Sequence, residues 1–370
     1  MIVEVKSKKQ ERQFLDVPKK IYEGDSHWIC PLDNDIRQIF DPKKNSFHKH
    51  GTSCRWILFD KGKPIGRISA FVNNQKADKQ VLPVGGIGFF ECINDQQAAT
   101  KLFDIAKDWL SVKGMRAMDG PINFGENDNF WGLLIEGFTS PSYGMNFHKP
   151  YYKNLFENYG FSIIYEQITN HLDVSKPFPE RFTRIAEWVM RKPGYTFKHF
   201  QKKNLQQFAA DFMEIYNDAW ENFENFQPIH METILESFKK MKLIMDEKLI
   251  WFAYVNNEPA SFILILPDAN QIIKDFNGKM NIWNSLSFLI NRRRKVNRMR
   301  AIVMGTKKNY QKHGLESALF IKLKEYVLPL HKYEELELSW VGDFNKEMIS
   351  IHKATGAEFG KKHATFRCHF

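Results

Sequence analysis

Apolar residues in the second half of the chain follow two periods. Between Leu315 and Val327 they recur at every fourth residue, which predicts a helix over residues 314–328. Shorter runs rich in β-branched and aromatic residues predict strands, and the polar stretch 256–259 predicts a turn that joins two of them as a hairpin. The other helices expected here are 205–220, 231–241 and 346–355, and the strands are 195–200, 249–255, 260–266, 300–304, 336–340 and the tail through 366.

A similar succession of elements is expected in the first half. The strands expected there are 54–59, 65–72, 86–92 and 115–122, and the helices are 96–112 and 151–159. Because helices and strands interleave throughout, the pattern predicts the α/β class, with a mixed sheet flanked by helices in each half.

Short sequence words recur in the two halves. The word around Pro64 resembles the word around Pro259, and the word around Gly160 resembles the word around Gly356, at separations of 195 and 196 residues. The segments that interrupt the alignment are 123–150 in the first half and 267–298 in the second. An internal repeat of this length predicts two tandem domains.

The expected domains are residues 1–172 and 194–370. The junction between them, residues 173–193, contains three prolines around a short helical pattern. The total length of 370 residues also exceeds what one hydrophobic core usually organises.

Composition and cysteine usage argue against a disordered chain, a disulfide-rich protein and a metal-binding protein. Hydrophobic residues make up 43% and charged residues 26%, which is ordinary for a globular protein. Cys30, Cys54, Cys92 and Cys368 lack CxxC spacing, so we expect neither a disulfide framework nor a metal site. No apolar run reaches a membrane-spanning length and the first residues lack the apolar core of a signal peptide, so a cytoplasmic location is expected.

The formal net charge of +10 suits a polyanionic partner, such as nucleic acid or the phosphates of a cofactor. The densest basic run lies between Arg292 and Arg300. Such a run binds phosphates in some proteins and is a solvated helix face in more of them.

One strand–turn–helix in the second half resembles the acyl-CoA site of the GNAT superfamily of N-acyltransferases. The family motif is Gln/Arg-x-x-Gly-x-Gly/Ala, and Gln311 and Gly314 match it whereas Glu316 does not. Backbone N–H groups at such a helix start can surround a pyrophosphate. The resemblance implies a mostly antiparallel sheet in each domain and acetyl-CoA or another acyl-CoA as co-substrate. The residues it implies for cofactor binding are Met304, Gly305, Lys307, Lys308, Gln311, Lys312, His313, Gly314 and Asn345.

A second family word, Asn-x-x-Ala-x-x-x-Tyr-x-x-x-Gly-Phe, is similar to the sequence from Asn345 to Ala357. His352 stands at the position of the family Tyr, which is the usual proton donor to the departing CoA thiolate. Histidine can perform that step near neutral pH, so the resemblance implies that His352 is the catalytic acid. The alternative is a histidine on the helix surface without a role.

The first half lacks these features, so no CoA site of its own is expected there. Asp95 precedes the helix at 96–112 and is expected to be its N-cap, and Phe156 stands at the position of the family Tyr.

The first half does contain an unusual polar loop after its last expected strand. Its carboxylates, amides and aromatic residues are candidates for substrate binding, and the alternative is a set of turn-forming and capping residues. The candidates are Asn123, Glu126, Asn127, Asp128 and Trp131.

The leading functional hypothesis is an acyl-CoA-dependent N-acyltransferase, with acetyl-CoA as the expected donor, in which a small-molecule or peptide amine attacks the thioester directly. Glu335, Glu337 and Asp343 are the candidates for a general base. One alternative is a catalytically inactive GNAT-like binding protein. The other is a Fem-type aminoacyltransferase whose basic run meets RNA, which is disfavoured because that run is not interleaved with aromatic residues.

Overall fold

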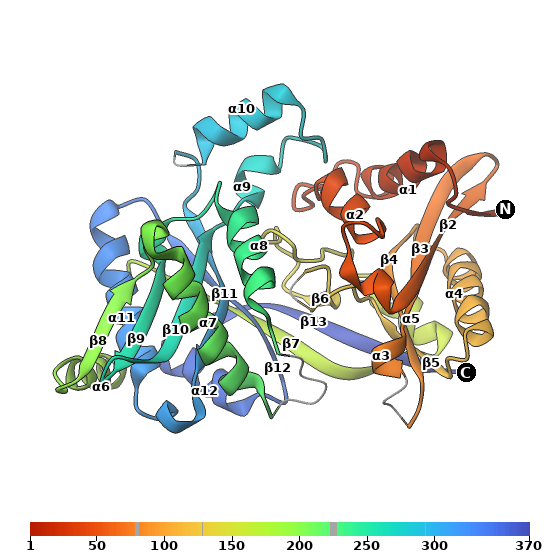
Figure 1. Cartoon of the computed structure of the whole chain (residues 1–370). Coiled ribbons are helices and arrows are strands. Elements are labelled where there is room, and N and C mark those ends of the chain that lie inside the picture. The colour runs from red at the N-terminus through yellow and green to blue at the C-terminus, as the bar shows by residue number, and fades with distance from the viewer. Residues whose placement is uncertain (78–80, 128, 223–227, 293) are drawn as a thin grey trace.

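One continuous sheet runs through the computed structural model, which describes residues 1–370 except 78–80, 128, 223–227 and 293 (Figure 1). The sheet has 13 strands in the order β1-β2-β3-β4-β5-β13-β7-β12-β11-β10-β9-β8, and β6 pairs with β13 beside this path. The strands of the first half are β1 (Ile2–Glu4), β2 (Gly51–Asp60), β3 (Lys63–Asn73), β4 (Val84–Cys92), β5 (Ala117–Gly120), β6 (Leu133–Glu136) and β7 (Ser162–Asp173). Those of the second half are β8 (Tyr195–His199), β9 (Ile250–Val255), β10 (Glu258–Pro267), β11 (Arg298–Thr306), β12 (Glu335–Gly342) and β13 (Glu358–His369).

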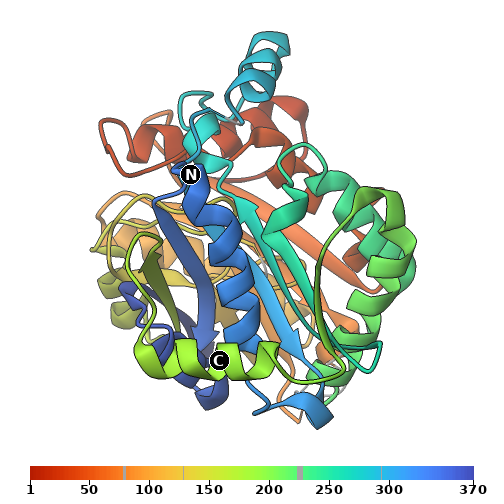
Figure 2. The same ribbon diagram turned by 90° about the vertical axis from the view of Figure 1, so that its left-hand side faces the viewer.

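Helices cover both faces of the sheet. In the first half they are α1 (Lys8–Ile21), α2 (Asp33–Ile39), α3 (Asn74–Ala77), α4 (Gln96–Val112) and α5 (Tyr152–Tyr159). In the second half they are α6 (Glu180–Met190), α7 (Leu205–Trp220), α8 (Met231–Met241), α9 (Asn270–Ile273), α10 (Ile282–Asn291), α11 (Leu315–Val327) and α12 (Lys346–Ala354). Figure 2 shows α11 lying along one face of the sheet of the second half, with α6 crossing its end.

The two halves have the same order of elements, which confirms the expected repeat. The succession β2-β3-β4-α4-β5-α5-β7 corresponds to β9-β10-β11-α11-β12-α12-β13. The two insertions also lie where the sequence puts them, because 123–150 contains β6 and 267–298 contains α9 and α10. Pairing is antiparallel except between β4 and β5 and between β11 and β12, so the mixed, mostly antiparallel sheet is confirmed.

The last strand of each half pairs with the other half. β13 lies beside β5 of the first half, and β7 lies beside β12 of the second half. The two exchanged strands also pair with each other over most of their length. Two expected sheets therefore merge into one, and neither half presents an unpaired edge at their junction. The domain boundaries 1–172 and 194–370 stay a prediction.

A separate core forms on each face of each half. In the second half, α6 and α11 bury one core, which includes Phe320 and Leu323, whereas α7 and α8 bury another, which includes Phe212 and Phe238. In the first half, α4 and α5 cover one face and α1 covers the other. Each core stabilises its part of the sheet by removing apolar surface from water.

Several elements differ from the expectation. The strand expected at 115–122 is shorter, because the N–H of Met115 is bonded to the carbonyl of Leu110 and Pro121 has no N–H to donate. The structure also contains α1, α10 and β7, which the sequence pattern did not indicate. No helix in the part of the chain that the structure describes is long and apolar enough to cross a membrane.

Candidate functional site

Two parallel strands diverge in the middle of the second half. β11 and β12 pair only as far as Ala301 and Leu338. Beyond these residues β11 follows β10 and β12 follows β7, so the facing edges have no strand partner among the described residues. We call residues 301–304 of β11 and 338–341 of β12 the fork.

Both strands are irregular at the fork. The register between β11 and β10 shifts at Ile302, and the register between β12 and β7 shifts at Ser339 and Trp340. The hydroxyl of Ser339 donates to the carbonyl of Ala301, which is the last paired residue of β11. Ile302, Ser339 and Trp340 are half-buried. Such irregularities expose backbone groups and occur often beside active sites.

His352 lies on α12 and contacts β7, the strand that pairs with β12 of the fork. Its Nδ1 is 3.0 Å from the side-chain amide nitrogen of Asn170, and Asn170 is directly opposite Leu338. An amide nitrogen only donates, so Nδ1 accepts and the ring proton is on Nε2. Burial lowers the pKa of His352 to about 4. The ring is therefore neutral at neutral pH, and its expected role as the catalytic acid stays a prediction.

The lysines of the expected phosphate turn are already paired with carboxylates. The Nζ of Lys307 contacts both Glu214 and Glu258, and this lysine is buried. The Nζ of Lys308 contacts Glu221. The backbone N–H of Lys308 also donates to Asp218, at 2.7 Å. These contacts neutralise most of the positive charge expected at the turn.

The start of α11 carries a carboxylate of its own. Oε1 of Glu316 accepts a hydrogen bond of 2.7 Å from the hydroxyl of Thr306, so the carboxylate lies in the first turn of the helix. Gly314 has a positive φ of 79°, and a side chain there would meet Ile185 of α6 at 2.6 Å. The glycine therefore permits close packing of α6 as well as any approach of a ligand.

The remaining cofactor candidates have different surroundings. Gln311 and Lys312 are exposed, whereas His313 is hydrogen-bonded through Nδ1 to Tyr195. Asn345 is the N-cap of α12 and accepts from the N–H of Met348. In β11, Met304 and Gly305 are buried, and Gly305 packs against Trp220 of α7.

The polar loop of the first half lies in the middle of the molecule, between the two halves (Figure 1). Asn123 is buried, Glu126 and Asn127 are exposed, and Asp128 lies outside the described residues. Trp131 donates from its indole N–H to the hydroxyl of Tyr165 on β7, at 2.8 Å.

An aromatic group connects this loop to the fork. The ring of Tyr165 packs edge-to-face on Phe344, with centroids 5.7 Å apart, and Phe344 follows the end of β12. Because side chains alternate along a strand, Tyr165 projects from one face of β7 and Asn170 from the other. Trp131 and His352 therefore lie on opposite faces of the sheet, on either side of the fork.

A buried ionic cluster occupies the centre of the sheet on the side of the loop. Lys361 donates to Glu337 at 3.0 Å, and Arg300 lies 3.7 Å from the same carboxylate. Burial alone would raise the pKa of Glu337, but the two cations lower it to about 2. Glu337 is thus a charged structural group, which does not suit the role of general base. Glu335, the neighbouring candidate, is paired with His171.

The basic run does not form one surface patch. Arg298 bonds to Asp268 at 2.6 Å and Arg300 bonds to the carbonyl of Tyr143, so both point into the protein. Arg294 and Lys295 are exposed. An RNA surface across the whole run is therefore disfavoured.

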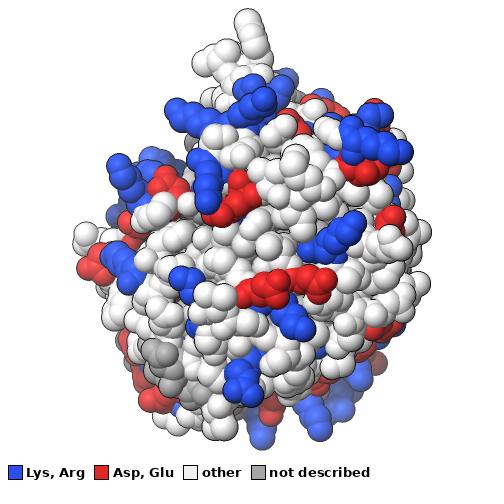
Figure 3. All heavy atoms as spheres, turned by 90° about the vertical axis from the view of Figure 1, so that its right-hand side faces the viewer, with Lys and Arg blue, Asp and Glu red and all other residues white. Residues whose placement is uncertain are grey.

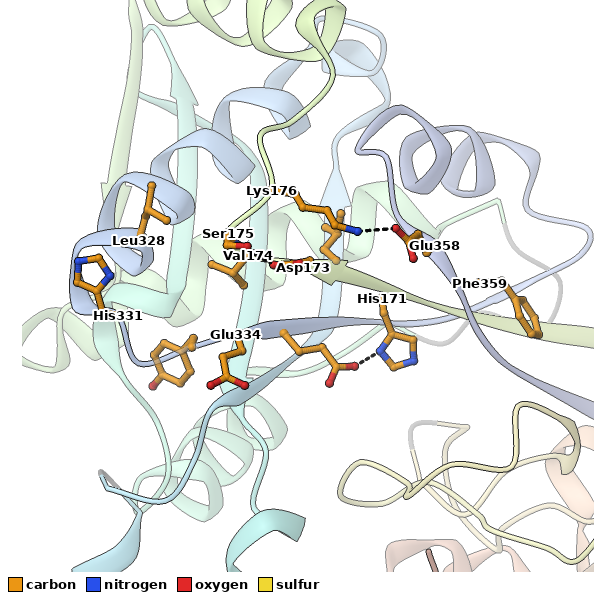
Figure 4. A pocket seen from close by; sticks show the side chains of 13 residues that line it. His171, Asp173, Val174, Ser175, Lys176, Leu328, His331, Glu334, Glu358 and Phe359 are labelled. Atoms are coloured by element: carbon orange, nitrogen blue, oxygen red, sulfur yellow. Dashed lines mark hydrogen bonds and ion pairs between the residues drawn. The ribbon is translucent and has the colours of Figure 1, made fainter.

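Two adjoining cavities lie near the end of β7 and the start of β12, and the smaller reaches Thr355 at the end of α12, the helix of His352. The smaller, of about 300 Å³, has a mostly apolar lining that includes Met299, Leu336 and Leu323, together with Thr355 from the end of α12. The larger, of about 680 Å³, is more polar, and Lys176 and Glu358 point toward one another across it at 2.9 Å (Figure 4).

The first half has a buried polar cluster near the end of β4. Tyr152 donates to Glu91 at 2.7 Å, and Arg67 lies 3.7 Å from that carboxylate. Asp95 accepts from the N–H of Ala98, so its expected role as the N-cap of α4 is confirmed.

Comparison with solved structures identifies this arrangement. A tandem GNAT protein from the clavulanic acid biosynthesis pathway superposes with a TM-score of 0.59 at 12% identity, covering 100% of this chain and 98% of the other. The chain has the tandem GNAT fold. A GCN5-related N-acetyltransferase from Sphaerobacter thermophilus also matches, with a TM-score of 0.56 at 10% identity, over 100% of this chain and 95% of the other.

Two curated proteins are similar to this chain along nearly its whole length. One, named bacterial ceramide synthase, is from Caulobacter vibrioides and is 26% identical over 99% of this chain and 96% of its own. The other, protein YghO from Escherichia coli, is 26% identical over 97% of this chain and 93% of its own. No protein-family model matches the chain.

Sequence reasoning missed the residues that surround the fork. Asn170 lies in β7, which the sequence pattern does not indicate, and the expected strand 336–340 includes Ser339 and Trp340 without giving them a role. The signal in the sequence was the pair Ser339-Trp340, which follows the alternation of apolar and polar residues that ends at Leu338.

Proposed function

We propose that this chain is an N-acyltransferase that moves an acyl group from acyl-CoA to the amine of a long-chain amino alcohol. The observation that carries the proposal is the fork within a tandem GNAT fold. A thioester placed between the diverging strands would meet unpaired backbone donors of β11, which could stabilise the oxyanion of the tetrahedral intermediate.

The acceptor class is suggested by the relative from Caulobacter vibrioides, which is named a ceramide synthase. A ceramide is the amide of a fatty acid with a long-chain amino alcohol. The half-exposed aromatic group of Trp131, Tyr165 and Phe344 offers an apolar approach for such an acceptor on the side of the loop.

The smaller cavity is a suitable place for the acyl chain. Met299 and Leu336 line it, and they precede the last paired residues of the fork, Ala301 and Leu338, by two positions. At about 3.3 Å per strand residue, the lining begins about 7 Å from the fork. An alkyl chain that enters there would leave water for an apolar surface, which favours binding.

His352 is proposed to stabilise the leaving thiolate as a neutral hydrogen-bond donor. Asn170 holds the proton on Nε2, and the low pKa keeps the ring uncharged, so Nε2–H can donate without the ring first taking up a proton. The amine attacks the thioester carbonyl, loses a proton to solvent, and the C–S bond breaks to release CoA.

The test is amide formation by the full chain. Acyl-CoAs of increasing length are incubated with sphinganine, with free thiol followed by the absorbance of its product with a chromogenic disulfide and the amide by mass spectrometry. We expect product with long acyl chains. The absence of any amide with all donors, from protein that binds acyl-CoA, would refute the proposed reaction.

Two variants of His352 separate donation from a structural role. His352→Gln retains an N–H donor and should keep more of the turnover than His352→Phe, which has none. Because the pKa of His352 is about 4, the wild-type rate should show no inflection from this residue between about pH 6 and 7. Equal turnover in wild type and His352→Phe would remove the residue from the mechanism.

Filling the smaller cavity tests the acyl-chain site. Leu323→Trp should reduce the rate with palmitoyl-CoA by about tenfold or more while leaving the rate with acetyl-CoA near its wild-type value. A loss of about 1.4 kcal/mol in the binding of the acyl chain corresponds to a tenfold loss of affinity. Equal losses with both donors would place the chain elsewhere.

A binding protein without catalysis is the second candidate. Glu316 and the paired state of Lys307 and Lys308 favour it, because they weaken the attraction of the turn for a pyrophosphate. Under that alternative, calorimetry would detect a bound acyl-CoA or amine while no thiol is released.

A further inference from the structure

The helix α10 presents its apolar side to solvent. Ile282, Trp283 and Ile290 are 70%, 75% and 59% exposed, and Leu286 and Leu289 are 45% exposed each. In a helix these positions fall within one stripe, because they are spaced by one, three and four residues. A helix on the surface of a globular protein normally turns such a stripe toward its core.

On the inward side of α10, Phe288 is the buried residue of the helix, and the polar residues make local hydrogen bonds. Phe288 is buried and packs into the core under α11, whereas Asn284 donates to the carbonyl of Lys279 and Asn291 donates to Ser287. Figures 1 and 2 show α10 projecting from the top of the molecule, away from the sheet. Its apolar stripe has no partner within the described part of the chain.

The segment around α10 is entirely basic among its charged residues. From Phe276 to Asn297 the sequence contains no Asp or Glu, and it contains Lys279 together with the run that begins at Arg292. Lys279, Arg294 and Lys295 are exposed. In Figure 3 an uncharged knob projects at the top of the molecule, with Lys and Arg side chains near its base.

We infer that α10 docks the protein on an anionic lipid surface. A stripe of Trp, Ile and Leu beside basic residues is the pattern of helices that lie in the interface of a bilayer, with the apolar side among the acyl chains and the cations at the phosphates. Ten residues are too few to cross the bilayer, so the helix lies in its plane. This inference rests on α10 alone and holds whether or not the chain transfers acyl groups.

The charge around α10 favours lipid over a second copy of the chain. Two copies that met through this stripe would bring Lys279, Arg294 and Lys295 of one molecule near the same residues of the other. Like charges at close range oppose such an association, whereas anionic headgroups attract them.

The test is co-sedimentation of the full chain with vesicles. We expect binding to phosphatidylcholine vesicles that contain phosphatidylglycerol, weaker binding to pure phosphatidylcholine, and a fall in binding as salt is raised. The double variant Trp283→Ser with Leu286→Ser should weaken vesicle binding by about tenfold or more, since each substitution removes an exposed apolar side chain that the bilayer would bury. Arg294→Glu with Lys295→Glu should remove the preference for phosphatidylglycerol.

The matched control is Trp188→Ser on α6, where the side chain is 59% exposed and its exposed apolar neighbour on the helix is Ile185, at 37%, in place of a stripe of several residues. It should bind vesicles like the wild type. Thermal unfolding of each variant checks that the fold is kept. The inference is overturned if the wild type does not bind the anionic vesicles, if both tryptophan variants bind equally, or if light scattering shows a dimer that the α10 variant makes monomeric.

Discussion

Charges around the helix start of α11 set how strongly this chain can hold a pyrophosphate. Glu316→Gln removes a carboxylate from the first turn while keeping an acceptor for Thr306. If CoA binds there, its affinity should rise about fivefold. Two like charges 4 Å apart in water repel each other by ~1 kcal/mol, and removing the repulsion between the carboxylate and a phosphate strengthens binding by that factor. Calorimetry with palmitoyl-CoA measures it. Glu325→Gln, near the other end of α11, is the control and should leave the affinity for palmitoyl-CoA unchanged. Equal effects of both variants would exclude the turn as the pyrophosphate site.

The pairing of Lys307 shows why the partners of single residues at this site could not be predicted from the sequence. Its partners Glu214 and Glu258 are 93 and 49 residues away, so only the fold brings them together. The match of Gln311 and Gly314 to the family motif located the turn, but it carried no information about the compensating carboxylates. His352 was found by its spacing from Asn345, whereas its partner Asn170 lies in the other half of the chain.

The buried charge of Glu337 makes a prediction about acid stability. Its pKa of about 2 lies below the ordinary value, so its contribution to stability is complete above about pH 5 and is lost as the pH falls toward 2. Glu337→Gln leaves Lys361 without its counter-charge and should lower the free energy of unfolding by about 3–5 kcal/mol, measured with urea at pH 7.

The variant should also lose part of the pH dependence between pH 5 and 2. Glu358→Gln, which removes a surface partner of Lys176, is the control and should leave the urea midpoint almost unchanged. Similar midpoints for wild type and Glu337→Gln would show that the cluster of Lys361 and Arg300 is not ionic in the folded protein.

At the scale of elements, the packing of α6 on α11 depends on Gly314. Gly24 has the same φ of 79° but open space around its Cα, so Gly24→Ala should cost only the strain of the left-handed conformation, about 1–2 kcal/mol. Gly314→Ala also pushes against Ile185 and should cost about 1 kcal/mol more, with urea unfolding as the measurement. Equal losses in the free energy of unfolding would mean that α6 moves to accommodate the added methyl group without a loss of stability.

Periodicity predicted the amphipathic helices with their ends and failed for elements with an unusual environment. α4, α7 and α8 have the predicted bounds because their apolar stripes face a core. β7 was missed because its central residues are polar: Gln167 and Thr169 are buried and His171 is half-buried, in a strand that pairs with β12 and β13. α10 was missed although its apolar residues recur at helical spacing, and the structure leaves its apolar stripe exposed.

At the scale of the molecule, the exchanged strands make the two halves depend on each other. Residues 1–193 alone lack β13 beside β5, and residues 194–370 alone lack β7 beside β12. Each half expressed alone should therefore aggregate or remain unfolded, since a long unpaired edge is left in its sheet. Co-expression of both pieces should give a one-to-one complex, detected by size-exclusion chromatography with light scattering. Cooperative melting of either half as a soluble monomer would contradict this dependence.

The repeat could be read from the sequence, and the exchange of strands could not. Matched words such as those around Gly160 and Gly356 reflect local structure that both halves share. Which strand follows β5 or β12 in the sheet is decided by pairing between segments far apart in the chain, such as Phe366 with Gly120 and Glu335 with Asp173, and no local pattern records that choice.

The central claim, that the fork holds the acyl thioester, is tested most directly by hydrogen–deuterium exchange of the full chain with and without palmitoyl-CoA. Amide protons that bind the ligand exchange more slowly. The fork at residues 301–304 and 338–341 and the start of α11 should be protected, whereas the outer strand β8 should not change. Protection at the start of α4 in the first half, with none at the fork, would contradict the claim.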